Sequence, residues 1–237
     1  NSMKAKKSSR RNFLKNSALA TAGFSIVPRH VLGKGFRAPS DTLYLAGIGA
    51  GGKGYSDLAE CAKSSAVKIV ALCDVDNRRA KRAVEEWPDA VYYNDYRKML
   101  AQESSIDAVT ISTPDHMHAI QAMAAMEKGK HVYVQKPLTH DIAEARQLTE
   151  AAHRYKLVTQ MGNQGASGEG VRKMQEWYNA GLIGDVTEVW CWTNRPVWPQ
   201  GIPWPKDKKI DIPSELDWDL WLGTEPKKDY VDNLVPF

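Results

Sequence analysis

Gly47-Ile48-Gly49-Ala50-Gly51-Gly52-Lys53-Gly54 is the stretch of this sequence that decides the fold. It follows the apolar run 43–48 and opens an amphipathic stretch at 52–63. Glycines in the pattern G-x-G-x-x-G at such a junction permit a tight turn and let the backbone approach a pyrophosphate at the helix N-terminus. A register that starts at Gly47 fits the pattern. We favour Gly49, Gly51 and Gly54, with Gly52 inside the turn, because the strand then runs through Ile48.

A carboxylate follows the second apolar run at the distance that a dinucleotide site requires. The run 67–73 ends at Asp74, about 20 residues beyond the glycine turn. A carboxylate there accepts hydrogen bonds from the adenosine ribose and repels a 2′-phosphate, which favours NAD over NADP. Arg78 and Arg79 can accommodate a 2′-phosphate, so NADP stays an alternative. A second alternative is that Asp74 only caps the next helix.

The rest of the chain to residue 162 alternates apolar runs with helical periods. Further strands are expected at 90–93, 108–112, 131–134 and 158–161, and helices at 77–87, 96–100, 116–128 and 142–155. Near-continuous apolar runs are typical of strands that are buried on both faces of a sheet. The pattern predicts an α/β protein with a Rossmann-type doubly wound parallel sheet over residues 41–162.

Two later strands end in polar residues, at the sheet edge where ligands bind in open α/β folds. Thr113, Pro114, His116 and His118 follow one strand, and Lys136-Pro137 follows the next. Lys136 can donate to a substrate oxygen, and burial would lower its pKa, although a lone lysine at a strand exit is more often a surface residue. We expect no metal at the two histidines, because a helix points them apart and no further ligand clusters with them.

Composition and charge narrow the class of protein. The chain has 237 residues, of which 43% are hydrophobic and 25% charged, as in globular proteins. Nine of its 32 Lys and Arg lie in residues 1–40, which hold no acid, so residues 41–237 carry 23 bases and 28 acids. This acidic balance argues against a nucleic-acid partner. Three cysteines do not make a disulfide framework.

The first forty residues read as an export signal. Ser9-Arg10-Arg11-Asn12-Phe13-Leu14-Lys15 precedes an apolar, small-residue stretch at 17–27, which is typical of a twin-arginine signal. The stretch is too short to remain in a membrane as a helix. We therefore expect residues 1–40 to be signal peptide and tether, the twin-arginine export machinery to be a partner, and the protein to be periplasmic or otherwise exported. A disordered basic arm is the alternative.

Taken together, these motifs resemble the Gfo/Idh/MocA family of oxidoreductases (glucose–fructose oxidoreductase, inositol dehydrogenase, rhizopine catabolism), in its exported bacterial branch. The resemblance runs from about Thr42 to the last residues. The segments that carry it are 49–54, 73–76, 106–109, 113–118, 129–137, 160–164, 181–184 and 218–223.

The resemblance implies a function and a second domain. It implies an NAD(P)-binding domain over 41–162 and, over 163–237, the beginning of an α+β substrate domain with an open sheet that often makes homo-oligomer contacts. It implies hydride transfer between nicotinamide and a secondary hydroxyl of a sugar, glycoside or cyclitol, with Lys136 as the catalytic residue beside that hydroxyl. Gln135 replaces the family's Glu, so the role of that acid is absent. The segment 113–118 corresponds to the turn along the cofactor. Asn163 and Gln164 match a turn near the ribose and nicotinamide, and Pro137 matches the family's proline.

Two other functions stay open. The family contains a redox-neutral glycosidase branch, in which bound NAD transiently oxidises the sugar at C3. That branch departs from Lys-Pro at this site, so Lys136-Pro137 argues against membership. The other alternative is a catalytically incomplete NAD-binding module.

The C-terminal third is rich in tryptophan and lacks histidine. Seven of the eight tryptophans follow residue 170, and we expect most of them to pack in a core. The candidates for substrate contact are Trp198 or Trp204 in the Pro/Trp-rich loop, Asn194 and Arg195. His153 is the last histidine. The resemblance implies an Asp-x-x-x-His pair in the second domain as general base. We therefore expect this pair beyond Phe237, in a domain that is truncated here. Of that domain, we expect a helix at 171–181 and a strand at 186–193 within this sequence.

Overall fold

The structure is a computed structural model that describes residues 41–194 and 210–231. Among these residues, those from Tyr44 onward belong to one compact unit. The predicted signal peptide, Arg195, Trp198 and Trp204 lie outside the described residues.

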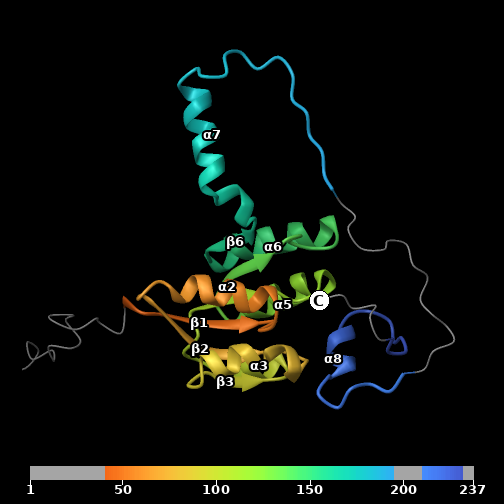
Figure 1. Ribbon diagram of the computed structural model, residues 1–237. Helices are drawn as coiled ribbons and strands as arrows, with labels where there is room; N and C mark the ends of the chain where they lie inside the picture. The colour runs from red at the N-terminus through yellow and green to blue at the C-terminus, as the bar shows by residue number, and fades with distance from the viewer. Residues whose placement is uncertain (1–40, 195–209, 232–237) are drawn as a thin grey trace, which may run out of the picture. The chain divides into compact units, whose positions relative to one another are not determined.

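Six parallel strands form one sheet (Figure 1). Their order is β3-β2-β1-β4-β5-β6, which is the order of the doubly wound dinucleotide-binding fold. This result confirms the Rossmann-type α/β class expected from the sequence. The strands are β1 Leu43–Ile48, β2 Val67–Cys73, β3 Val91–Tyr93, β4 Ala108–Ile111, β5 His131–Gln135 and β6 Thr159–Gly162.

Helices cover both faces of the sheet. The helices of this part are α2 Lys53–Ala62, α3 Asn77–Glu86, α4 Tyr96–Gln102, α5 His118–Glu127 and α6 Ile142–Tyr155, with a short 3-10 turn, η2 Asp115–Met117, before α5. Alternate residues of a strand face opposite layers: Ala46 and Ile48 pack with α4, α5 and α6, whereas Leu45 packs with α2 and α3. Because helices bury both faces of the sheet, the strands carry apolar side chains on both faces, which explains their near-continuous apolar runs.

Aspartates set the points at which several helices begin. Asp76, Asp95 and Asp141 are the N-caps of α3, α4 and α6, and each side chain accepts a hydrogen bond from a backbone N–H of the first turn. Because α2, α3 and α4 start within a few residues of a strand end, their N-termini gather at the carboxyl edge of the sheet. That edge therefore has backbone donors available for an anionic ligand.

Residues after β6 follow the predictions only in part. They form η3 Gln164–Ser167, α7 Glu169–Asn179, which confirms the predicted helix, and α8 Trp218–Leu222. The strand predicted at 186–193 is wrong: that segment has no regular structure. A strand needs a neighbour to complete its hydrogen bonds, and residues 163–194 and 210–231 provide none. The open-sheet domain stays a prediction.

No helix within the described ranges is both long enough and apolar enough to cross a membrane.

Candidate functional site

The glycine turn between β1 and α2 is built by close backbone approaches. Gly49 has a positive φ of 80°, and its N–H donates to the carbonyl of Cys73 at 2.8 Å. A Cβ on Gly54 would lie 1.6 Å from the carbonyl oxygen of Gly49, so only glycine lets α2 start here. Glycines of the alternative register are constrained as well, because a Cβ on Gly47 would lie 2.7 Å from Cδ1 of Leu58 and Gly52 has a positive φ of 51°. The register that starts at Gly49 stays a prediction.

Asp74 connects this turn to the end of β2. Its Oδ2 accepts from the N–H of Gly51 at 2.9 Å, and its Oδ1 accepts from the N–H of Asp76 at 3.0 Å. Burial raises the pKa of Asp74, and these two N–H groups offset only part of that rise. The cap of α3 is Asp76, so helix capping does not account for Asp74.

Arg78 and Arg79, the two arginines that made NADP an alternative cofactor, have different surroundings. Arg78 makes a bidentate ion pair with Asp76, with Nε–Oδ1 at 2.9 Å and Nη2–Oδ2 at 2.6 Å. Burial alone would raise the pKa of Asp76, but the hydrogen bonds from Arg78 outweigh it and hold that pKa below its ordinary value. Arg79 lies over the glycine turn, with Nη2 at 3.1 Å from the position of a Cβ on Gly52.

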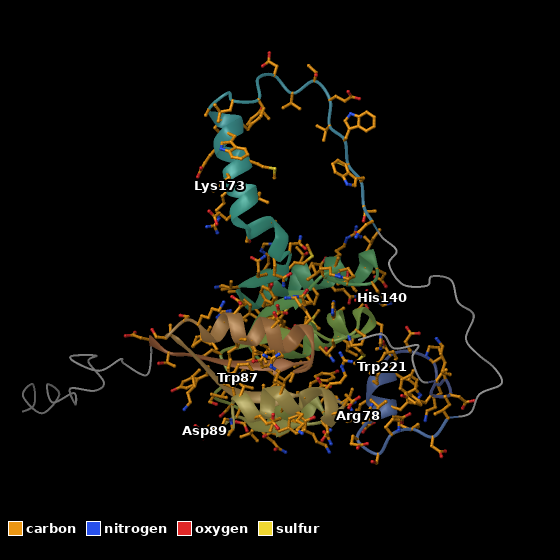
Figure 2. The ribbon with its side chains drawn as sticks, in the orientation of Figure 1. Arg78, Trp87, Asp89, His140, Lys173 and Trp221 are labelled. Atoms are coloured by element: carbon orange, nitrogen blue, oxygen red, sulfur yellow. The ribbon has the colours of Figure 1, made fainter. Side chains whose placement is uncertain are left out.

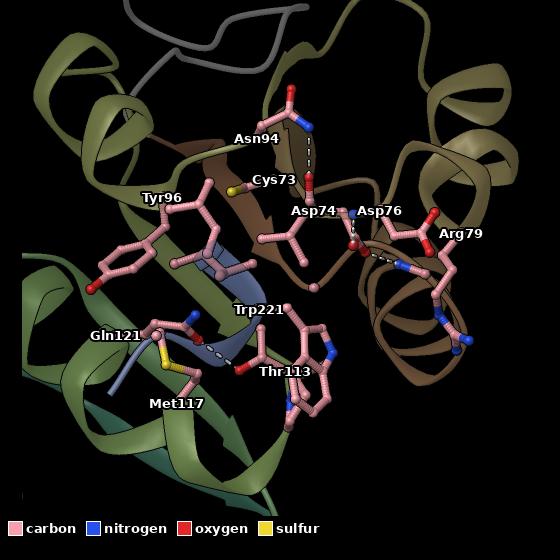
Figure 3. A pocket seen from close by; sticks show the side chains of 18 of the residues that line it. Cys73, Asp74, Asp76, Arg79, Asn94, Tyr96, Thr113, Met117, Gln121 and Trp221 are labelled. Atoms are coloured by element: carbon pink, nitrogen blue, oxygen red, sulfur yellow. Dashed lines mark hydrogen bonds between the residues drawn. The ribbon is translucent and has the colours of Figure 1, made fainter. Parts of the chain in front are cut away.

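A cavity of about 1160 Å³ runs along the carboxyl edge of the sheet (Figure 3). Its volume slightly exceeds the usual range for small-molecule sites, as suits an extended dinucleotide. The cavity brings together many of the predicted residues, although they come from four different strand ends. Those that line it are Gly49, Gly51, Asp74, Thr113, Pro114 and Lys136.

Lys136 follows β5 and faces this cavity, and its peptide bond to Pro137 is cis. The side chain is exposed. The burial that was expected to tune this lysine is therefore absent from the structure.

Several other predicted residues do not line the cavity: Gly52, Gly54, His116, His118, Pro137, Asn163 and Gln164. The structure gives His118 a different role from the predicted cofactor contact. Its side chain is 1% exposed, and its ring nitrogens contact the carbonyl oxygens of Pro137 at 2.6 Å and Thr113 at 2.8 Å. His118 therefore connects the loop after β4 to the loop after β5.

A buried carboxylate that the sequence analysis missed is hydrogen-bonded to residues that line the cavity. Asp57 on α2 is 5% exposed, and it accepts hydrogen bonds from four side chains. The donors are Lys53, Ser112 at 2.9 Å, Gln135 at 2.7 Å and Gln164 at 3.3 Å. The amide of Gln135 thus has a role of its own here, because it joins the end of β5 to α2. In the sequence, the only sign of this buried site was that Asp57 is a polar residue next to Leu58 and its apolar neighbours.

Aromatic residues of α8 were also missed as site residues. Trp218 and Trp221 line the cavity, and Trp218 is 6% exposed. The predicted core packing of most C-terminal tryptophans holds for Trp218 but not for Trp190 and Trp192, which are 77% and 88% exposed.

The predicted substrate contacts remain predictions. Asn194 is exposed and does not line the cavity. Arg195 and Trp198 fall in a range that the structure does not describe.

The strand order, the glycine turn and the carboxylate after β2 define a dinucleotide-binding Rossmann domain. A dinucleotide fits the residues present. The turn between β1 and α2 has glycine at the positions where a Cβ would clash with neighbouring protein atoms, so its backbone can approach a pyrophosphate. A family model described as "Oxidoreductase family, NAD-binding Rossmann fold", for Gfo/Idh/MocA proteins, matches residues 44–163. The chain belongs to this family.

Known relatives differ in what their names say. The chain is 35% identical to a "Glycosyl hydrolase family 109 protein" from Shewanella baltica, over 61% of this chain and 37% of that protein. Among solved structures, myo-inositol 2-dehydrogenase from Lactobacillus plantarum has a TM-score of 0.57 and 27% identity, over 61% of this chain and 43% of that one. Scyllo-inositol dehydrogenase from Lactobacillus casei, solved with bound NAD(H) and scyllo-inositol, has a TM-score of 0.56 and 27% identity, over 62% of this chain and 43% of that one. The chain thus spans less than half the length of each of these proteins.

Proposed function

We propose that this chain is the NAD-binding part of an oxidoreductase that transfers a hydride between nicotinamide and a secondary hydroxyl of a sugar, glycoside or cyclitol. The observation that carries the proposal is that Lys136 lines the same cavity as Asp74 and the glycine turn. The names of the two inositol dehydrogenases support a polyhydroxylated substrate.

The chain's own residues supply binding and orientation. Bound NAD supplies the hydride acceptor or donor. The glycine turn admits the pyrophosphate, and Asp74 accepts from the ribose hydroxyls. Lys136 donates a hydrogen bond to the substrate oxygen and orients the carbon that loses or gains hydride, while a general base takes the hydroxyl proton.

NAD is proposed over NADP on electrostatic grounds. Asp74 and Asp76 both line the cavity, and Arg78 is already paired with Asp76. A 2′-phosphate would therefore meet carboxylates, although Arg79 also lines the cavity. The family description names NAD as well.

A screen of sugars and cyclitols that follows NADH absorbance tests the proposal. It is run with this chain and with a version extended past Phe237, and calorimetry with NAD accompanies it. We expect NAD binding in both, and NADH formation that Lys136→Ala abolishes. Absence of NAD binding would overturn the cofactor assignment. NAD binding with neither NADH formation nor cleavage of a chromogenic glycoside by either version would support the catalytically incomplete module.

Redox-neutral glycoside cleavage is a second candidate, which the names of the Shewanella relatives favour. It needs the same cofactor site, but the NADH formed by oxidation at C3 is consumed again before the product leaves. A chromogenic glycoside distinguishes the two functions. Release of free sugar without net NADH would favour cleavage, whereas net NADH without release would favour the dehydrogenase.

We propose that the protein is exported by the twin-arginine machinery, in agreement with the exported branch of the family. The support is the sequence Ser9-Arg10-Arg11-Asn12-Phe13-Leu14-Lys15. This route suits an enzyme that must acquire a cytosolic cofactor before it leaves the cell.

Residues 163–237 are proposed to begin a substrate and oligomerisation domain. Helix α7 supports this assignment, because none of its residues is buried although Met174 and Trp177 are apolar. Apolar side chains of this size are normally covered in a complete assembly. A homo-oligomer is part of the same proposal.

A further inference from the structure

The segment 215–230 returns to the first domain and closes one end of the cavity; we call it the return segment. On one side it joins the loop between β2 and α3. The N–H of Asp217 donates to the carbonyl of Val75 at 2.8 Å, and the N–H of Asn77 donates to the carbonyl of Glu215 at 3.0 Å. An antiparallel bridge between Asp76 and Leu216 lies between these two bonds. The return segment thus pairs by its backbone with residues next to Asp74.

On its other side the return segment holds the loop after β4. The Nε2–H of His116 donates to the carbonyl of Trp221 at 3.0 Å, and the hydroxyl of Thr224 donates to the carbonyl of His116 at 3.3 Å. A Cβ on Gly223 would lie 2.1 Å from Sδ of Met117, so the backbone of the return segment packs directly on η2. The return segment therefore spans the cavity from β2 to β4.

Trp221, in the middle of the return segment, is positioned by contacts with two other rings. Its ring stacks on Trp218 with centroids 4.8 Å apart and an interplanar angle of 13°, and it lies 5.3 Å from the ring of His116. Trp218 is fixed in turn by a 2.7 Å hydrogen bond from its Nε1–H to the carbonyl of Lys228. Trp221 remains half-buried and lines the cavity near Thr113 (Figure 3). It presents a rigid flat apolar surface to whatever occupies that end.

The strand order decides which part of a dinucleotide lies there. Asp74 follows β2 and Lys136 follows β5, and β1 and β4 separate these two strands. With about 4.8 Å between neighbouring strands, the two residues mark ends of the cavity roughly 14 Å apart. The return segment pairs by its backbone with residues 75–77, directly after Asp74, and it hydrogen-bonds the loop after β4. We therefore assign it to the end of the cavity at which the adenosine ribose lies.

We propose that Trp221 is the adenine platform of the cofactor site and that the return segment closes over the adenosine half of NAD. Indole offers the large rigid π surface on which a purine stacks. This inference rests on the proposed NAD function, because it assigns a subsite within the same cavity. It adds a binding element that lies far from the Rossmann motif in sequence.

The test compares cofactor fragments by calorimetry on the full chain. NAD, ADP-ribose and nicotinamide mononucleotide are titrated into wild type, Trp221→Ala and the control Trp177→Ala, whose indole is 51% exposed on α7. Stacking of a base on an aromatic ring predicts that Trp221→Ala weakens NAD and ADP-ribose between about fivefold and 150-fold. Binding of nicotinamide mononucleotide should be equal in all three proteins. Unchanged ADP-ribose affinity in Trp221→Ala would overturn the inference.

A second variant separates stacking from loss of folding. Trp221→Phe keeps an aromatic ring in the stack on Trp218, and circular dichroism checks that both variants are folded. We expect AMP to quench the tryptophan fluorescence of wild type, and Trp221→Phe to lose most of that quenching. Equal quenching in the two proteins would count against the platform. If wild type binds neither NAD nor ADP-ribose, the proposed function itself fails, and that outcome is distinct from both results above.

Discussion

At the residue scale, the amide of Gln135 pairs with the buried carboxylate of Asp57 in a way that a glutamate could not. This amide donates to Asp57 at 2.7 Å, and both residues are 5% exposed. A glutamate at 135, as in the family pattern, would place two carboxylates against each other unless one were protonated. The Gln–Asp pair avoids this repulsion, and it keeps the backbone just before Lys136 fixed to α2.

We therefore expect Gln135→Glu to destabilise the fold by about 1–3 kcal/mol, because it removes a donor from a buried carboxylate and adds a charge. Urea unfolding measures the change. The double variant Asp57→Asn/Gln135→Glu reverses the donor and acceptor, and it should recover part of the loss. Gln147→Glu on the exposed side of α6 is the control and should change stability by less than about 0.5 kcal/mol. A loss no larger than that of the control would exclude the proposed repulsion.

Asp74 should make cofactor affinity depend on pH. Burial holds its pKa above the ordinary value of 3.8, so the carboxylate protonates at a higher pH than an exposed Asp does. Only the ionised form accepts fully from the ribose hydroxyls, and NAD affinity should therefore fall as pH is lowered toward that pKa. Calorimetry over acidic pH checks this trend.

Asp74→Asn is the matched variant for that measurement. It should lose about 1.5–3 kcal/mol of NAD binding free energy at neutral pH, because a charged acceptor is gone, and its pH profile should be flatter. Asp89→Asn, at an exposed position labelled in Figure 2, should behave as wild type. A steep acid profile that survives in Asp74→Asn would assign the titration to another group.

At the scale of elements, the first turn of α2 packs so closely on the glycine turn that an added methyl group at Gly54 would disrupt the contact. The first turn of α2 lies against Gly49, and a Cβ on Gly54 would enter the space of the Gly49 carbonyl oxygen. Gly54→Ala should therefore destabilise the chain by about 1–3 kcal/mol through overpacking, and should weaken NAD binding. Thermal unfolding and NAD calorimetry measure the two effects.

Gly170→Ala in α7 is the control for that substitution. Nothing lies within 4 Å of a Cβ at Gly170, and alanine favours a helix over glycine by about 0.5–1 kcal/mol. The same chemical change should thus be neutral or stabilising there. Equal losses at Gly54 and Gly170 would show that the close approach at Gly49 is not the cause.

The sheet was largely predictable because each strand is a short apolar run with a turn signal at its end. The predicted strand ends agree with β1 and β2 and differ by one residue at β4, β5 and β6. The run 186–193 misled the prediction, because apolar alternation does not show whether a neighbouring strand exists. Asp57 was missed since its donors, such as Ser112 and Gln135, come from other elements and are visible only in the fold.

At the scale of the whole molecule, the cofactor site draws on segments from both ends of the described chain. His116 and Trp221 are joined although 105 residues separate them. No local sequence pattern predicts such a contact, which is why the glycine turn and Asp74 were foreseen whereas the return segment was not. Figure 2 shows Arg78 and Trp221 near the same end of the molecule, although they belong to distant parts of the sequence.

Export is a prediction for the whole protein. Arg10→Lys together with Arg11→Lys keeps the charge of the proposed signal peptide but removes the arginine pair, and it should abolish translocation. Cell fractionation measures the exported share. Lys6→Arg together with Lys7→Arg is the control with the same number of conservative changes, and it should leave export intact. Normal export of the first variant would argue for a plain basic arm instead.

The long-range docking of the return segment also bears on how this protein is made. A ribosome produces the chain from its N-terminus, so every strand of the sheet has been synthesised before Trp221 is. Contacts between residues far apart in sequence require a large loop to close, and they form late and slowly compared with local ones. The sheet is therefore able to form first, with one end of its cavity open, and NAD can enter during that interval. Capture of the cofactor would then belong to the biosynthesis of the protein, ahead of any passage across a membrane.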